Sequence, residues 1–218
     1  MTNAAKTMSA RVTLGVTVDL EPMLRASIRA SKRQHLGTDE VTEQDMQRAR
    51  EVFAARTHEE KQAPDPTVLE RIRKGLPEGV ELVELLEARD GSTSTSGTVL
   101  QVNDLSLLPA ITIDNSQPGQ TPAKPFEKFA VTSEGKLLTL QGALEDPGVA
   151  VDGASEANPI FSAVKMWLKV ELPTKPKSHN ARRTDGGALI WELVLGADLS
   201  PKGGRQTVPV ELCCVLPS

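Results

Sequence analysis

The sequence predicts an α+β fold, in which a helical N-terminal region is followed by an antiparallel β-sandwich or barrel. Apolar residues recur at helical spacing through much of the first 90 residues, and from Thr98 onward they alternate with polar residues at a period of two. Short alternating segments separated by turns rich in Pro and Gly are typical of sandwiches and barrels. We therefore expect an N-terminal arm with a strand at 1–20, a helical region at 21–90 and an antiparallel β domain at 98–218.

The N-terminal arm contains one clearly patterned strand. Four apolar residues share one face of it, with polar residues or glycine between them: Val12, Leu14, Val16 and Val18. Helical patterns follow directly, so the partner of this strand is expected either far along the sequence or in another chain. Because a terminal strand can add to the sheet edge of a neighbouring molecule, these four residues are the predicted oligomer contacts.

Three helices are expected in the next region. The first has Pro22 in its opening turn and stops at Gly37, which is a natural C-terminal residue for a helix. The second is expected at 43–62, with Thr42 as its N-cap, and the third at about 66–74.

The next segments connect the two regions. Residues 79–88 fit either a helix or a bulged strand, and both interpretations stay open. The sequence GSTSTSG at 91–97 has the composition of a flexible loop, so it is the expected boundary between the helical region and the β domain.

Seven strands are expected after this boundary, at 98–103, 106–113, 128–133, 136–141, 162–172, 188–196 and 206–216. The last three alternate most clearly. We expect the leucine at the centre of each, namely Leu168, Leu193 and Leu212, to be buried.

Two basic segments are the candidate binding surfaces. The first is one flank of the first helix, where four cations lie at i, i+4, i+7 and i+8: Arg25, Arg29, Lys32 and Arg33. The second joins two strands at 173–187 as a protruding basic finger and carries Lys175, Lys177, Arg182 and Arg183. Either set has the charge to contact a phosphate backbone or an acidic protein surface, and either also fits an ordinary solvated surface.

Composition limits the function classes. The net charge of −4 repels nucleic acid overall, and the aromatic fraction of 3% disfavours base stacking, so any nucleic-acid binding depends on a local basic patch. The phosphate-binding, dinucleotide-binding, serine-hydrolase and zinc-protease motifs are all missing from the sequence. The adjacent Cys213 and Cys214 lack the spacing of a zinc site, and we expect reduced thiols, no metal and no cofactor.

Compartment and function follow from these observations. No apolar run reaches the ~20 residues of a membrane span, and the N-terminus lacks the apolar segment of a signal peptide, so the protein is expected in the cytoplasm or a virion rather than secreted. The leading hypothesis is a non-enzymatic structural or assembly protein, such as a viral capsid subunit or another large homo-oligomer. The alternative is a nucleic-acid-binding accessory protein that uses the basic helix and the basic finger. A further alternative is an enzyme whose site is assembled from scattered residues.

Overall fold

The computed structural model describes residues 7–58, 66–113, 123–145, 163–194 and 207–216. Its elements in chain order are β1 (Ala10–Asp19), α1 (Glu21–Leu36), α2 (Glu43–His58), α3 (Pro66–Gly75), β2 (Val80–Asp90), β3 (Thr93–Val102), the 3-10 helix η1 (Leu105–Ala110), β4 (Ala130–Glu134), β5 (Leu137–Glu145), β6 (Val164–Glu171), β7 (Ser178–His179), β8 (Arg183–Asp185), β9 (Ala188–Val194) and β10 (Thr207–Val215).

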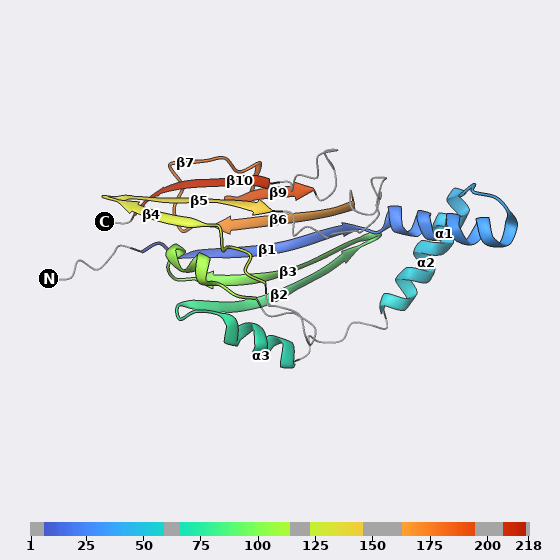
Figure 1. The fold of residues 1–218 in the computed structure, drawn as a ribbon, viewed down its shortest axis with the longest axis horizontal. Helices are drawn as coiled ribbons and strands as arrows, with labels where there is room; N and C mark the ends of the chain where they lie inside the picture. Colours follow the sequence, from blue (N-terminus) through green and yellow to red (C-terminus); the bar gives the residue numbers. More distant parts are fainter. Residues whose placement is uncertain (1–6, 59–65, 114–122, 146–162, 195–206, 217–218) are drawn as a thin grey trace.

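The strands form two antiparallel sheets, so the α+β class is confirmed (Figure 1). The order is β2-β3-β1-β6-β9-β8 in the six-stranded sheet and β4-β5-β10-β7 in the four-stranded sheet. Neither sheet closes on itself within the described residues. The predicted sandwich or barrel is therefore confirmed only as far as two antiparallel sheets.

Strand β1 lies inside the six-stranded sheet, where it pairs with β3 on one side and β6 on the other. Val12, for example, lies opposite Leu100 of β3 and Val170 of β6. The partners of β1 are thus distant in the sequence, as one of the two alternatives predicted. Because both of its edges are already paired within the chain, the expected addition of this strand to a neighbour's sheet is wrong.

Strands β2 and β3 form a hairpin that crosses the expected domain boundary. Residues 80–90 are a strand with an irregular register between Leu82 and Glu84, so the bulged-strand interpretation is correct. The loop predicted at 91–97 is wrong, since Gly91 makes the turn with φ 57° and Thr93 already begins β3. Glycine at position 97 suits a strand here, because a Cβ would lie 2.8 Å from the carbonyl oxygen of Leu14 on β1.

A single hydrophobic core joins the two sheets. Its buried side chains come from segments as far apart as Ile72 on α3 and Leu216 after β10. The three predicted core leucines are confirmed, with exposed fractions of 1% for Leu168, 3% for Leu193 and 1% for Leu212. The expected division into a helical region and a separate β domain is therefore not observed. Helix α3 contributes Ile72 to the common core, and strands β1 to β3 lie in the same sheet as β6, β8 and β9.

The strand predicted at 106–113 is wrong, because most of this segment forms η1. The side chain of Asp104 accepts a hydrogen bond from the backbone N–H of Ser106 and so caps the short helix. Leu105, Leu108 and Ile111 are all buried, at a spacing of three residues that suits a 3-10 helix. The remaining predicted strands correspond to β3, β4, β5, β6, β9 and β10.

Helices α1 and α2 form a hairpin that projects past one end of the sheets (Figure 1). The predicted ends of α1 are confirmed by Pro22 in its first turn and by Gly37, whose φ of 65° is left-handed. Thr42 caps α2 as predicted: its hydroxyl accepts from the N–H of Asp45, and the Asp45 carboxylate accepts from the N–H of Thr42. Residues 59–62 of the predicted second helix lie outside the described residues.

Two contacts fix the hairpin to the sheet. The backbone N–H of Leu20 donates to the carbonyl of Ser92 in the β2–β3 turn at 2.8 Å. The guanidinium carbon of Arg89 on β2 lies 4.8 Å from the ring centroid of Phe53 on α2, a cation–π distance. The hairpin is thus held at the end of the sheet by one contact directly before α1 and by another on α2.

Candidate functional site

The projecting hairpin leaves much of its first helix, α1, exposed. No side chain of α1 is buried, although the helix is 16 residues long. Leu24 and Ile28 are half-buried where α1 packs on α2, and Met46 of α2 is fully buried there, outside the main core. One face of α1 is therefore used to hold the hairpin together, and the opposite face is open.

Ion pairs stabilise the contact between the two helices. Arg50 of α2 bridges two carboxylates, with its Nε 3.0 Å from Glu21 and another guanidinium nitrogen 2.7 Å from Glu43. Hydrogen bonds from Arg50 lower the pKa of Glu21, and the same interactions raise the pKa of Arg50. The carboxylate of Glu21 is therefore held in its charged form, beside the first turn of α1 where negative charge is favoured.

The predicted basic stripe on α1 divides into two halves. Lys32 forms an ion pair with Asp45, and Arg33 forms one with Asp39 through its Nε at 2.7 Å. The hydrogen bond from Lys32, followed by those from Thr42, holds the pKa of Asp45 well below its ordinary value of 3.8. These two cations serve the hairpin itself, and the pairing reduces the charge they offer to a partner.

Arg25 and Arg29 behave differently. Both are exposed, and within the part of the chain that the structure describes neither forms an ion pair. They lie one turn apart, so their charges follow the same flank of α1. Half of the predicted stripe is thus available to an external anion.

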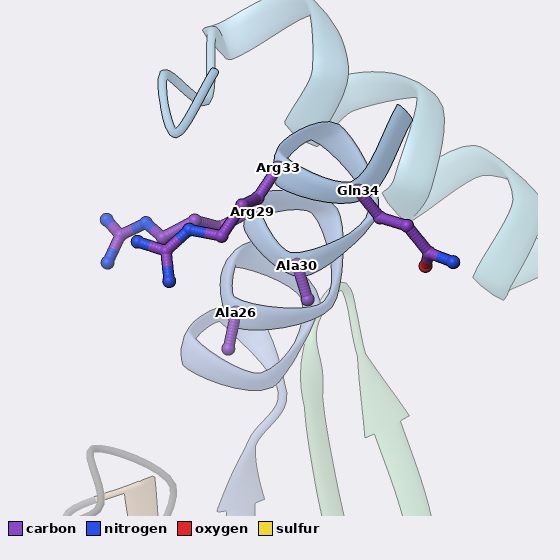
Figure 2. A pocket seen from close by; sticks show the side chains of 5 residues that line it. All are labelled: Ala26, Arg29, Ala30, Arg33 and Gln34. Carbon is purple, nitrogen blue, oxygen red and sulfur yellow. The ribbon is translucent and has the colours of Figure 1, made fainter. Parts of the chain in front are cut away.

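A shallow groove of about 390 Å³ runs along the open face of α1. It is lined by Ala26, Arg29, Ala30, Arg33 and Gln34. Figure 2 shows the side chains of Arg29 and Arg33 extending side by side away from the helix, while the short side chains of Ala26 and Ala30 leave the helix surface accessible. The groove therefore combines a small apolar floor with a cationic wall.

The basic finger predicted at 173–187 is not a protruding loop. It leaves β6 of the six-stranded sheet, pairs as β7 with β10 of the four-stranded sheet, and returns as β8 to pair with β9. Backbone hydrogen bonds from Lys177 to Cys213 and from Arg182 to Ile190 hold it against both sheets. The segment is a clasp between the sheets, and its cations are presented from a fixed backbone.

The four cations of this segment are only partly free. Arg183 pairs with Glu192 of β9 at 3.0 Å. Lys175, Lys177 and Arg182 are exposed, and the described residues contain no carboxylate paired with them. The structure does not bring this set next to the α1 groove, since the segment lies on the sheets and α1 projects beyond their end (Figure 1).

The four predicted oligomer contacts are placed in the interior of the six-stranded sheet. Val12 is fully buried, and Leu14 packs against the core. Val16 and Val18 are half-buried nearer the hairpin, opposite Met166 and Val164 of β6. Their main contacts are within the chain, so the reason for assigning them to an oligomer interface no longer holds.

Strand β2 is a feature whose importance the sequence did not reveal. It lies at the edge of the six-stranded sheet, with β3 as its one paired neighbour in the described chain. The register shift exposes Val83, which is 48% accessible, between Glu81 and Glu84. The sequence allows a bulged strand at 79–88, but the position of this strand at a sheet edge depends on tertiary pairing, which no local pattern reveals.

The described residues offer little chemistry. They contain no group of three or more His, Cys, Asp or Glu side chains placed to hold a metal ion. Cys214 is buried, and its burial, together with the adjacent Cys213, raises the pKa of its thiol to about 11. None of the described helices has both the length and the apolar character needed to cross a bilayer.

Comparisons with protein-family models, with curated proteins and with solved structures find no match to this chain.

Proposed function

We propose that this chain is a non-enzymatic assembly protein that forms a homo-oligomer through its projecting α1–α2 hairpin. The observation that carries the proposal is the open face of α1: a 16-residue helix without a buried side chain, in a hairpin that is fixed to the end of the sheet by specific contacts. A helix that only covered a core would bury one face against it.

Exposed apolar side chains support the same proposal. The large hydrophobic residues exposed in the described chain are Met23, Leu36, Val52, Val83 and Val215. The first three belong to the hairpin, and Leu36 is 69% exposed. Three of these five exposed apolar side chains thus lie on the projecting hairpin, which the assembly would cover.

The native mass tests this proposal. Light scattering after size-exclusion chromatography, over a range of concentrations, should give a defined particle heavier than the monomer. The variant Ala30→Trp should reduce that mass, because an indole ring would fill the groove from an exposed position without disturbing the core. Gln44→Trp, which places the same ring on an exposed position of α2, is the matched control and should assemble normally. A native chain that stays monomeric at every concentration would contradict the proposal.

A second candidate function is nucleic-acid binding by the same helix. Arg25 and Arg29 are exposed and unpaired among the described residues, and the small side chains of Ala26 and Ala30 would permit close approach to a phosphate backbone. Retention on double-stranded nucleic acid that falls steeply with salt and is lost in Arg25→Gln/Arg29→Gln would favour this function. Retention unaffected by the two substitutions would count against it.

A further inference from the structure

We infer that the open face of α1 docks onto the acidic edge strand β2 of a second copy of this chain, so that copies associate head to tail. This inference rests on the proposed assembly function and names the surface that receives the hairpin. Helix α1 carries four cations, of which Lys32 and Arg33 are paired with Asp45 and Asp39, so the charges that it offers to a partner are chiefly those of Arg25 and Arg29.

The receiving surface has the opposite charge. Residues 78–90, which include β2, contain five acidic residues against Arg89 alone, a net charge of −4. Glu84 pairs with Arg11 of β1 at 3.1 Å. Glu78, Glu81 and Glu87 are exposed, and the described part of the chain provides no cation in an ion pair with them. Arg25 and Arg29 on one copy and Glu78 and Glu81 on another are therefore complementary charges, and none of the four forms an ion pair within the described residues of a single chain.

The two surfaces also match in their apolar parts and in length. Val83 projects from the bulge between acidic residues, while Ala26 and Ala30 form a shallow apolar floor beside the arginines. The 16 residues of α1 extend about 24 Å. The 11 residues of β2 extend about 36 Å, so the helix fits along the strand. An apolar contact flanked by opposite charges is the usual arrangement of a specific interface.

A symmetric pairing of two α1 helices fits less well. In such a pair a two-fold axis places the flank of one helix beside the same flank of its partner. Arg25 and Arg29 would then face the same two arginines of the other copy, which is repulsive. An unlike surface is required, and β2 is a surface of the described chain that supplies the opposite charge.

Strand addition at the β2 edge is also disfavoured. A bulge interrupts the row of backbone groups there, and charged side chains on an edge strand oppose pairing with another strand. Side-chain docking of a helix avoids both obstacles. Because the two surfaces differ, each copy would receive one hairpin and offer another, and the contact would generate a reciprocal dimer, a larger ring or a filament.

Charge reversal with rescue tests the inference. Arg25→Glu/Arg29→Glu should weaken association at least about tenfold, and Glu78→Arg/Glu81→Arg should do the same, because each puts like charges in contact. Mixing these two variants should restore assembly, because the acidic hairpin of one then meets the basic strand of the other, and the unchanged hairpin of the second meets the unchanged strand of the first. One chain carrying all four substitutions should also assemble again. Arg48→Glu, on an exposed position of α2 outside the groove, is the control. Circular dichroism of each variant establishes that it is folded.

The outcomes separate the inference from the proposed function. Loss of assembly in both double variants, with recovery in the fourfold variant, would support the inference. If the native chain assembles and the fourfold variant does not recover, the receiving surface is not β2, and the inference falls while the assembly function stands. If the native chain is monomeric and the arginine variant instead loses salt-sensitive retention on nucleic acid, both fall and the nucleic-acid function is favoured.

Discussion

The side-chain oxygen of Asn180 lies 2.7 Å from the indole nitrogen of Trp191, the largest fully buried side chain of the described core. The same oxygen accepts the backbone N–H of Glu211 at 2.8 Å, and the amide nitrogen of Asn180 donates to the carbonyl of Pro209. Trp191 belongs to β9 of the six-stranded sheet, whereas Pro209 and Glu211 belong to β10 of the other. One side chain of the clasp thus connects the two sheets.

Asn180→Ala should therefore lower the free energy of unfolding by about 1–3 kcal/mol, because it leaves the buried indole N–H without an acceptor. Urea denaturation measures the change. In a Trp191→Phe background the donor is absent, so the same substitution should cost clearly less. Equal costs in the two backgrounds would show that the Asn180–Trp191 bond does not contribute. Thr174→Ala, at an exposed position of the same segment, is the control.

The three core leucines provide a second prediction. Leu168→Ala, Leu193→Ala and Leu212→Ala should each cost about 2–5 kcal/mol, since each removes buried methyl groups and leaves a cavity in the shared core. The control is Leu36→Ala at the exposed end of α1, which should stay within about 0.5 kcal/mol of the unmodified chain. A core substitution as mild as this control would mean that the side chain is not packed as described.

Gly15 permits the close packing of Trp167 on the other face of the six-stranded sheet. A Cβ at position 15 would lie 2.2 Å from the indole ring, which also donates to the hydroxyl of Thr17 at 3.1 Å. Gly15→Ala should cost about 1–3 kcal/mol and change the tryptophan fluorescence, because the ring must move. Combined with Trp167→Ala the substitution should be nearly neutral, since the obstructing ring is gone. If Gly15→Ala still lowered the free energy of unfolding in the Trp167→Ala background, the steric clash would not be with the indole ring.

Acid should weaken the hairpin before the sheets. The pKa of Asp45 is lowered in the folded chain by Lys32 and Thr42, so its contribution to stability is complete above its ordinary pKa of 3.8 and is lost as the pH falls below that value toward the folded pKa. The pKa values of Glu21 and Asp39 are lowered by Arg50 and Arg33, and they act in the same direction.

Two optical signals separate the parts of the molecule in this experiment. Helical circular dichroism reports chiefly on α1, α2 and α3, whereas both tryptophans lie in the sheets, on β6 and β9. On acidification the helical signal should fall at a higher pH than the fluorescence changes. Asp45→Asn should reduce the pH dependence of the helical signal, and Glu40→Gln, whose side chain forms no ion pair among the described residues, should not. Coincident transitions in the native chain would contradict independent loss of the hairpin.

The elements predicted correctly are those in which one local pattern decides the structure. Pro22 and Gly37 mark the ends of α1, the capping pair of Thr42 and Asp45 marks the start of α2, and strict alternation identifies β6, β9 and β10. These signals depend on neighbouring residues, so tertiary structure does not need to be known. The basic stripe on α1 was also found, because its spacing places the cations on one flank.

The errors occur where tertiary contacts decide. Ser and Thr at 91–97 have the composition of a loop, but pairing with β1 and β2 on both sides makes β3 a strand. At 173–187 the charges suggested a free finger, yet the contacts that hold this clasp come from Ile190 and Cys213, which no local pattern reveals. The pairing of Lys32 with Asp45 likewise depends on how α1 and α2 pack.

The interior position of β1 has a consequence for synthesis of the chain. Val12 leaves the ribosome early, but its partner Val170 on β6 is made only after most of the sequence has been translated. The β2–β3 hairpin is synthesised much sooner and can pair with one edge of β1. Until β6 is made, the other edge of β1 keeps unpaired backbone groups next to apolar side chains. A nascent chain that pauses before Glu171 therefore presents an open template for pairing with a foreign strand. The interval between the synthesis of β1 and the synthesis of β6 is therefore the period in which a chaperone would protect this protein most.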